Sequence, residues 1–85
     1  MTSKLERVLN DAVLDSLEET LDVGALMLGI LGKLEVSAVR GVSLGFEVAE
    51  VDGKIFLVSV SARTPHRRGV RLAFSEELDK PHKHT

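Results

Sequence analysis

The spacing of apolar residues changes from helical to alternating near residue 33, and this change limits the folds open to the chain. Up to residue 31, apolar side chains recur every three or four positions, as on one side of a helix. From residue 34 they alternate with polar ones, as in strands with one buried face. A chain of 85 residues makes one domain. We therefore predict an α+β domain (ααββββ), with two N-terminal helices packed on one face of a three- to four-stranded antiparallel meander sheet.

The first helix is predicted over residues 4–20. Ser3 and Glu6 have the spacing of a capping box, in which the serine hydroxyl accepts from the Glu6 N–H. A second helix is predicted over residues 23–31, with Asp22 as its N-cap and Gly32 as its C-terminal stop. This segment is apolar all round and must be buried. Its glycines leave an irregular loop or a strand as alternatives.

Four strands are expected over residues 34–38, 42–48, 55–62 and 70–74, and the first two can be one bent strand. The domain then covers residues 1–74, and residues 75–85 form a polar, frayed C-terminal tail.

The hairpin between the second and third strands has an Asp52-Gly53 pair, the usual two-residue turn. With that turn, the apolar faces of the two strands lie on opposite sides of the sheet. We therefore predict a three-residue loop over 51–53, with Gly53 at positive φ and Phe46 facing Val58.

The helices and strands carry more apolar side chains than one small core can bury. Large exposed apolar patches usually mark an interface, so we expect a homo-oligomer, a dimer or higher. Six apolar residues are expected in that interface: Leu14, Leu21, Leu26, Ile30, Ile55 and Leu57.

Four arginines and a histidine lie within residues 63–71, where Pro65 and Gly69 predict a strand-to-strand loop. Guanidinium groups bind carboxylates and phosphates in a two-pronged geometry. The candidate binding residues are Arg63, His66, Arg67, Arg68 and Arg71. A solvated loop that keeps the sheet soluble is the simpler interpretation. As a ligand we favour an acidic protein over nucleic acid, because the chain has a net charge of −2 and no Tyr or Trp to stack on bases.

Carboxylates with spacings of 4, 3 and 4 line one side of the first helix: Asp11, Asp15, Glu18 and Asp22. A straight helix spreads them along its axis, so a solvated face, or a docking site for a basic loop, is favoured over a cation site. His82 and His84 lie in the tail and are interpreted as incidental. No metal site and no cofactor are predicted.

The function predicted from these features is a small non-catalytic protein–protein interaction module: an adaptor, a regulatory subunit or an inhibitor. Nucleic-acid or phosphate-ligand binding through residues 63–71 is the alternative. No nucleophile, general acid/base pair or phosphate-binding glycine motif is visible, so we do not expect an enzyme. The absence of cysteine agrees with a reducing cytoplasm. The longest apolar run is too short to span a membrane.

Overall fold

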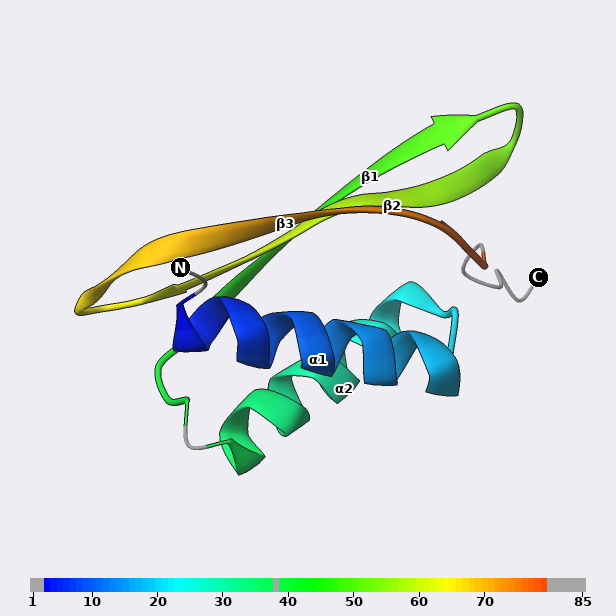
Figure 1. Ribbon diagram of the computed structural model, residues 1–85. Coiled ribbons are helices and arrows are strands. Elements are labelled where there is room, and N and C mark those ends of the chain that lie inside the picture. Colours follow the sequence, from blue (N-terminus) through cyan, green and yellow to red (C-terminus); the bar gives the residue numbers. More distant parts are fainter. Residues whose placement is uncertain (1–2, 38, 80–85) are drawn as a thin grey trace.

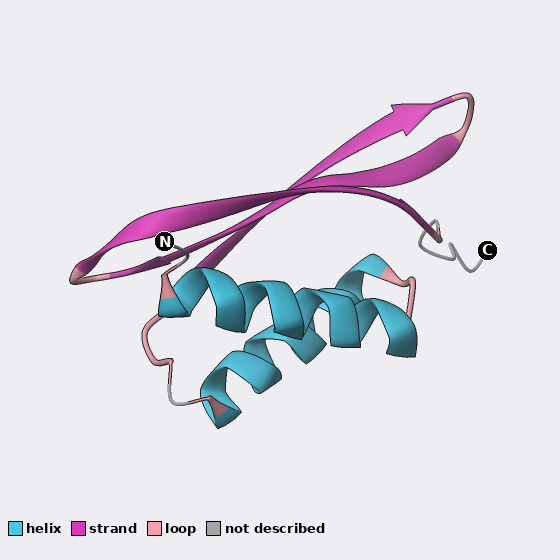
Figure 2. Cartoon of the chain, viewed as in Figure 1, coloured by secondary structure: helices cyan, strands magenta, loops and turns pink. Residues whose placement is uncertain are grey.

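The computed structural model describes residues 3–37 and 39–79, and within them two helices precede three strands. The chain order is α1 (Lys4–Glu19), α2 (Val23–Val36), β1 (Ser43–Val51), β2 (Lys54–Thr64) and β3 (Arg67–Leu78). The strands form one antiparallel sheet in the order β1-β2-β3, and both helices lie on the same side of it (Figures 1 and 2). The predicted α+β arrangement is confirmed, with three strands rather than four in the described residues.

Helix α1 begins where its capping sequence indicates. The Ser3 hydroxyl accepts a hydrogen bond from the Glu6 backbone N–H at 3.1 Å, and the last helical residue is Glu19. Five of its residues are buried: Leu5, Leu9, Ala12, Val13 and Ser16. Their spacing of three and four positions puts them on one side of the helix, which therefore becomes the core side.

Helix α2 also begins at its predicted cap, because Asp22 Oδ2 accepts from the Ala25 N–H at 2.9 Å. The sequence predicted that α2 stops at Gly32, but the helix continues to Val36. The reason is a four-residue period: Leu26, Ile30 and Leu34 are all fully buried on one side of a continuous helix. The strand predicted over residues 34–38 is therefore wrong for residues 34–36, and Ala38 lies outside the described residues.

The β1–β2 hairpin has a two-residue turn and not the three-residue loop that we predicted from the sequence. Val51 pairs with Lys54, and both Asp52 (φ 53°) and Gly53 (φ 78°) have positive φ, as a type I′ turn requires. Positive φ at Gly53 is confirmed, whereas the three-residue loop is wrong. Phe46 pairs with Val60, not with Val58 as predicted.

A β-bulge in β2 brings the apolar faces back together. Val48 pairs with Leu57 but Glu47 pairs with Ser59, which leaves Val58 as an extra residue on β2. The side chains of β2 alternate between the two faces of the sheet, and the extra residue at Val58 shifts this alternation by one position. Leu57, Val60 and Ala62 all reach the helix-covered side, here called the inner face, and all three are buried. The strong Asp-Gly turn is thus kept, and one inserted residue corrects the register.

The core lies between the inner face and the two helices. Its buried apolar residues are Leu5, Leu9, Ala12, Val13, Leu26, Ile30, Leu34, Leu57, Val60, Ala62 and Leu78. Phe46 and Phe74 pack against this cluster. Phe56 pairs with Ala49 next to the inward-facing Leu57, so alternation places it on the opposite side of the sheet, here called the outer face.

The β2–β3 connection is a tight hairpin and not the loop that Pro65 and Gly69 predicted. Thr64 pairs with Arg67, so Pro65 and His66 are its two turn residues. At its far end β3 runs on to Leu78, where the sequence predicted a polar tail from Ser75. Leu78 is buried, and the Asp79 N–H donates to the Leu21 carbonyl at 3.0 Å, which attaches this end to the α1–α2 connection.

The sheet is longer than the helix layer that covers it. A compact domain of this length has a radius of gyration of about 12 Å, whereas this chain has 13.2 Å and a longest dimension of 42 Å. The turn end of the β1–β2 hairpin projects away from the helices (Figure 1). Val48 and Val51 on this projecting arm are 47% and 53% exposed.

Candidate functional site

The basic residues predicted as a binding loop are divided between two places. Arg63, His66 and Arg68 are exposed at or beside the β2–β3 turn. Arg71 lies further along β3, on the outer face, opposite Ser61. The Arg67 backbone belongs to β3, but its side chain lies outside the described residues.

Arg71 takes part in a polar network that crosses all three strands. Its guanidinium forms an ion pair with the Glu47 carboxylate of β1, with Nη2 3.1 Å from Oε2. Its Nε donates to Ser59 Oγ of β2 at 3.3 Å. This network covers Ser59, which is only 6% exposed. Arg71 is therefore engaged on the outer face and separate from the basic residues at the turn.

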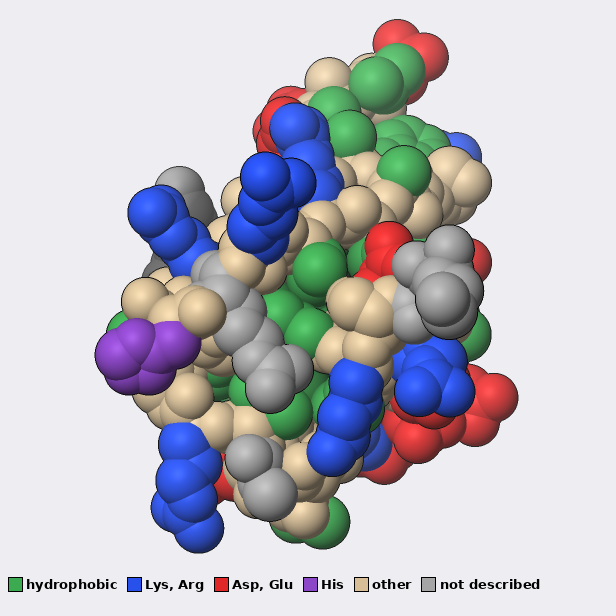
Figure 3. All heavy atoms as spheres, turned by 60° about the vertical axis from the view of Figure 1, so that its left-hand side comes forward, with side chains coloured by type: hydrophobic (Ala, Val, Ile, Leu, Met, Phe, Trp, Pro, Cys, Tyr) green, Lys and Arg blue, Asp and Glu red, His purple; other side chains and the backbone are tan. Residues whose placement is uncertain are grey.

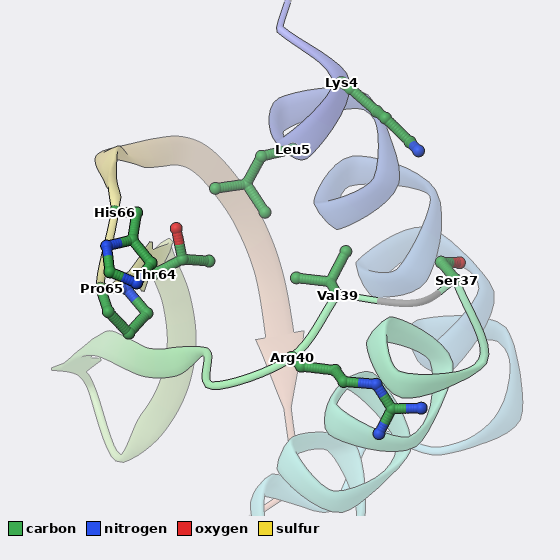
Figure 4. A pocket seen from close by; sticks show the side chains of 8 residues that line it. All are labelled: Lys4, Leu5, Ser37, Val39, Arg40, Thr64, Pro65 and His66. Carbon is green, nitrogen blue, oxygen red and sulfur yellow. The ribbon is translucent and has the colours of Figure 1, made fainter.

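A hollow of about 280 Å³ lies between the β2–β3 turn, the start of α1 and the α2–β1 connection. Three apolar side chains, Leu5, Val39 and Pro65, line it. Three basic residues line it as well: Lys4, Arg40 and His66. Figure 3 shows basic side chains placed around an apolar hollow on this end of the molecule, and Figure 4 shows the lining residues. We call this site the cationic hollow.

Two polar groups complete the lining of the cationic hollow, Ser37 and Thr64. The Thr64 Oγ1 atom is buried, and no hydrogen-bond partner for it exists among the described residues. Within residues 3–37 and 39–79, the two ion pairs are Lys33–Glu19 and Arg71–Glu47, so Lys4 and Arg40 are in no ion pair there. The sequence analysis selected His66 but missed Lys4 and Arg40, which lie 62 and 26 residues before His66 in the sequence.

A second surface without a partner is the side of α2 that faces away from the core. Its exposed residues are Gly24, Ala25, Leu28, Gly32, Glu35 and Val36, here called the α2 outward face. Leu28 is 73% exposed and Val36 is 89% exposed. Glu35 is the single charged residue of this face.

The six residues predicted for a subunit interface do not form one surface. Leu26, Ile30 and Leu57 are fully buried in the core, so the prediction is wrong for them. The two α2 residues lie on the core side of their helix, and the bulge at Val58 turns Leu57 inward. Ile55 is half-buried and packs against the core.

Leu14 and Leu21 are exposed, by 46% and 39%. Leu14 lies two positions from Ser16, the α1 residue that faces Gly29 of α2. Two helical positions turn a side chain by about 200°, so Leu14 points away from α2. Leu14 therefore belongs to a different surface from the α2 outward face, and Leu21 lies in the connection between the two helices.

The four carboxylates of the predicted acidic row, Asp11, Asp15, Glu18 and Asp22, are all exposed. Among the described residues, no group of three or more Asp, Glu, His or Cys is placed to hold a metal ion. His82 and His84 lie outside that part of the chain.

Neither helix in the described ranges has the length and hydropathy that crossing a bilayer requires. No family model, curated protein or solved structure matches this chain.

Proposed function

We propose that the protein is a small non-catalytic interaction module that self-associates through the α2 outward face. The observation that carries this proposal is the exposure of Leu28 and Val36, by 73% and 89%, on a face whose single charged residue is Glu35. Contiguous exposed apolar surface is costly in water and usually marks an interaction site. As a module of this kind the protein would serve as an adaptor, a regulatory subunit or an inhibitor.

The pattern of side-chain sizes on this face favours a second copy of the chain as the partner. Gly24 and Gly32 lie four residues before and four residues after Leu28, on the same ridge of the helix. An antiparallel contact between two copies of α2 centred on Leu28 therefore places each Gly24 beside a Gly32 of the other copy. A Cβ added at Gly32 has no atom within 4 Å, so this part of the face is open to a partner. Such a contact is self-complementary, as a two-fold dimer requires.

The test is the mass of the protein in solution as a function of concentration. We expect light scattering or sedimentation equilibrium to give twice the chain mass of 9.3 kDa at high concentration. Leu28→Glu should weaken association at least about 100-fold, since a charge replaces the central contact. Leu14→Glu is the matched control, because it places the same change on another helix face, and it should leave association unchanged. A mass of 9.3 kDa at all concentrations up to millimolar would contradict the proposal, as would unaltered association of a folded Leu28→Glu variant.

A second candidate function is the binding of an acidic protein at the β2–β3 turn. Arg63, His66 and Arg68 are exposed there, and no ion pair engages them within the described residues. A carboxylate-rich partner needs few guanidinium groups, whereas nucleic acid needs many cations on one face. The net charge of −2 makes nucleic acid the weaker alternative. We also propose a cytoplasmic setting, on the ground that the chain has no cysteine.

Polyglutamate and a single-stranded oligonucleotide are suitable probes for this candidate. We expect polyglutamate to bind in a salt-dependent manner and Arg63→Glu with Arg68→Glu to abolish its binding. Lys54→Glu, at the opposite hairpin, is the matched control and should keep it. Equal binding of polyglutamate by the wild type and the double variant would refute this candidate, and preferential binding of the oligonucleotide would favour nucleic acid instead.

A further inference from the structure

The sheet has two edge strands, β1 and β3, and they differ in how their edges are protected. β3 carries several arginines and glutamates, pairs irregularly with β2 at two places, and is attached to the α1–α2 connection through the Asp79 N–H. Charges, bulges and covering segments of this kind keep an edge from pairing with another chain. β1 contains no Lys, Arg or Pro, and within the described ranges its backbone is hydrogen-bonded to no element other than β2. The open edge of the sheet is therefore that of β1.

The free backbone groups of this edge belong to the even-numbered residues of β1. In a two-residue hairpin the residues that flank the turn form a hydrogen-bonded pair, and such pairs alternate with non-hydrogen-bonded ones along the ladder. Val51 flanks the turn and bonds to β2, so Glu50 directs its N–H and C=O away from β2. Because the bulge is on β2, the alternation of β1 is unbroken, and Leu44, Phe46 and Val48 direct theirs to the free edge as well.

The side chains of these residues give the free edge an apolar inner side. Leu44, Phe46 and Val48 pair with buried residues of β2, so their side chains lie on the inner face. Leu44 and Phe46 pack against the core but are only half-buried, and Val48 is 47% exposed. A further strand beside β1 would cover this row with its own side chains and remove apolar surface from water.

The charge of β1 determines which strand fits this edge. Glu47 and Glu50 are exposed, and β1 has no basic residue. Glu47 is in the ion pair with Arg71, whereas Glu50 is in no ion pair within residues 3–37 and 39–79. Pairing of β1 with β1 of a second copy would bring four glutamates and no basic residue into one ladder, which like-charge repulsion disfavours. A strand with basic residues opposite the glutamates has the complementary charge.

We propose that the free edge of β1 binds an extended, basic segment of a partner protein, which adds to the sheet as a fourth strand. Backbone hydrogen bonds to the even-numbered residues of β1 hold the segment, and its apolar side chains cover the inner row. Its lysines or arginines face Glu47 and Glu50. The segment runs antiparallel to β1, which is the more stable pairing. This site lies on β1 and not on the α2 outward face, so it does not depend on self-association.

The probe for the test is the end-blocked peptide Lys-Thr-Val-Lys-Val-Thr-Val, and amide chemical shifts of the full-length protein are the readout. In the antiparallel register its lysines lie opposite Glu50 and Glu47. Its valines lie opposite Val48, Phe46 and Leu44, on the inner face. We expect saturable shifts at the β1 amides. The same peptide with glutamate in place of both lysines should bind at least about tenfold more weakly, because two attractive cross-strand pairs become repulsive.

N-methylation of the peptide tests whether a backbone ladder forms. The valine N–H groups point at β1 and the threonine N–H groups point away from it, because alternate residues of a strand bond to the same neighbour. Methylation of the first two valine nitrogens should weaken binding at least about tenfold, since two hydrogen bonds are lost. Methylation of both threonine nitrogens is the matched control and should leave binding unchanged.

A charge reversal tests the same pairing from the side of the protein. Glu50→Lys should weaken binding of the lysine peptide several-fold and strengthen binding of the glutamate peptide. Glu18→Lys makes the same change on the exposed side of α1 and should alter neither.

The proposal is overturned if the lysine peptide gives no saturable shift at the β1 amides up to about 10 mM. It is equally overturned if the two methylated peptides bind alike, or if the glutamate peptide binds as well as the lysine peptide. Shifts of the β1 amides that grow with the concentration of Leu28→Glu alone would mean that a second copy pairs there, and would refute the basic partner. Leu28→Glu should bind the lysine peptide like the wild type, so failure of the self-association proposal and failure of this one can be distinguished.

Discussion

The contact between Ser16 of α1 and Gly29 of α2 provides a double-mutant test of how the two helices pack. Ser16 is 1% exposed, and its Oγ has no hydrogen-bond partner among the described residues. A Cβ added at Gly29 would lie 3.2 Å from Ser16 Oγ and 3.7 Å from Ser16 Cβ. The hydroxyl oxygen is therefore the atom that obstructs an alanine at position 29.

The magnitudes follow from this geometry. Alanine in a helix is favoured over glycine by about 1 kcal/mol, but overpacking a core contact costs about 1–3 kcal/mol, so Gly29→Ala alone should be neutral to destabilising. Ser16→Ala should stabilise by about 1 kcal/mol, because it removes a buried hydroxyl without a partner. In that background the nearest side-chain atom is at 3.7 Å, an ordinary contact, so Gly29→Ala should then add about 1 kcal/mol. The coupling between the two changes equals the relieved overpacking, about 1–3 kcal/mol.

Urea unfolding followed by far-UV circular dichroism measures all four free energies of unfolding, since the chain has no Trp or Tyr for fluorescence. Gly32→Ala is the matched control, because a Cβ at Gly32 has no atom within 4 Å. It should stabilise by about 1 kcal/mol whether residue 16 is serine or alanine. If Gly29→Ala has the same effect in both backgrounds, the hydroxyl does not limit the approach of the helices and the reasoning is refuted.

Three other outcomes are expected from the same unfolding assay, at concentrations below self-association. Gly53→Ala should lower the free energy of unfolding by about 1–2 kcal/mol because Gly53 has φ 78°, whereas Asp52→Gly at φ 53° should lower it by less than about 0.5 kcal/mol. Equal losses for the two variants would argue against the type I′ turn. Ile30→Ala should cost about 2–5 kcal/mol because this residue is fully buried, and Leu28→Ala should cost less than about 0.5 kcal/mol because Leu28 is 73% exposed; a reversed order would mean that α2 is turned the other way. Arg71→Ala should cost less than about 1 kcal/mol, since both side chains of its ion pair are more than half exposed, and a larger loss would show that the outer-face network contributes to stability.

Local capping signals predicted where both helices begin. Long-range packing decided where α2 ends, which local signals did not predict. Ser3 and Asp22 marked both starts because an N-cap acts within one turn. The end of α2 was missed because Gly32 resembles a stop signal. The four-residue repeat of Leu26, Ile30 and Leu34 was the available evidence for a longer helix.

The hairpin register shows how two local rules compete. The Asp52-Gly53 pair indicates a two-residue turn, and alternation indicates a loop one residue longer. The chain satisfies both by inserting Val58 as a bulge, which no rule based on regular alternation predicts. The same bulge explains why Leu57, expected at an interface, is a core residue.

The sequence predicted only those parts of the candidate sites whose residues lie close together along the chain. The basic cluster around His66 is visible because its members lie within nine residues. Lys4 and Arg40 reach the same hollow through the fold, so only the structure associates them with His66. The apolar character of α2 was evident, but which of its sides faces water depends on the helix continuing past Gly32.

The projecting β1–β2 arm has a consequence for the order in which the backbone opens. Its turn residues, Asp52 and Gly53, are exposed, whereas Val60 and Ala62 of β2 are buried in the core beneath the helices. Ladder hydrogen bonds at the tip can break with little loss of buried apolar area, but those from Leu57 onward break only when the helices leave the sheet, because Leu57 is fully buried in the core. Amide hydrogens along β2 therefore exchange on two timescales: fast where neighbouring strands alone hold the strand, and at the rate of global unfolding where the helices cover it. Leu57, directly before the bulge, marks the boundary between the two regimes.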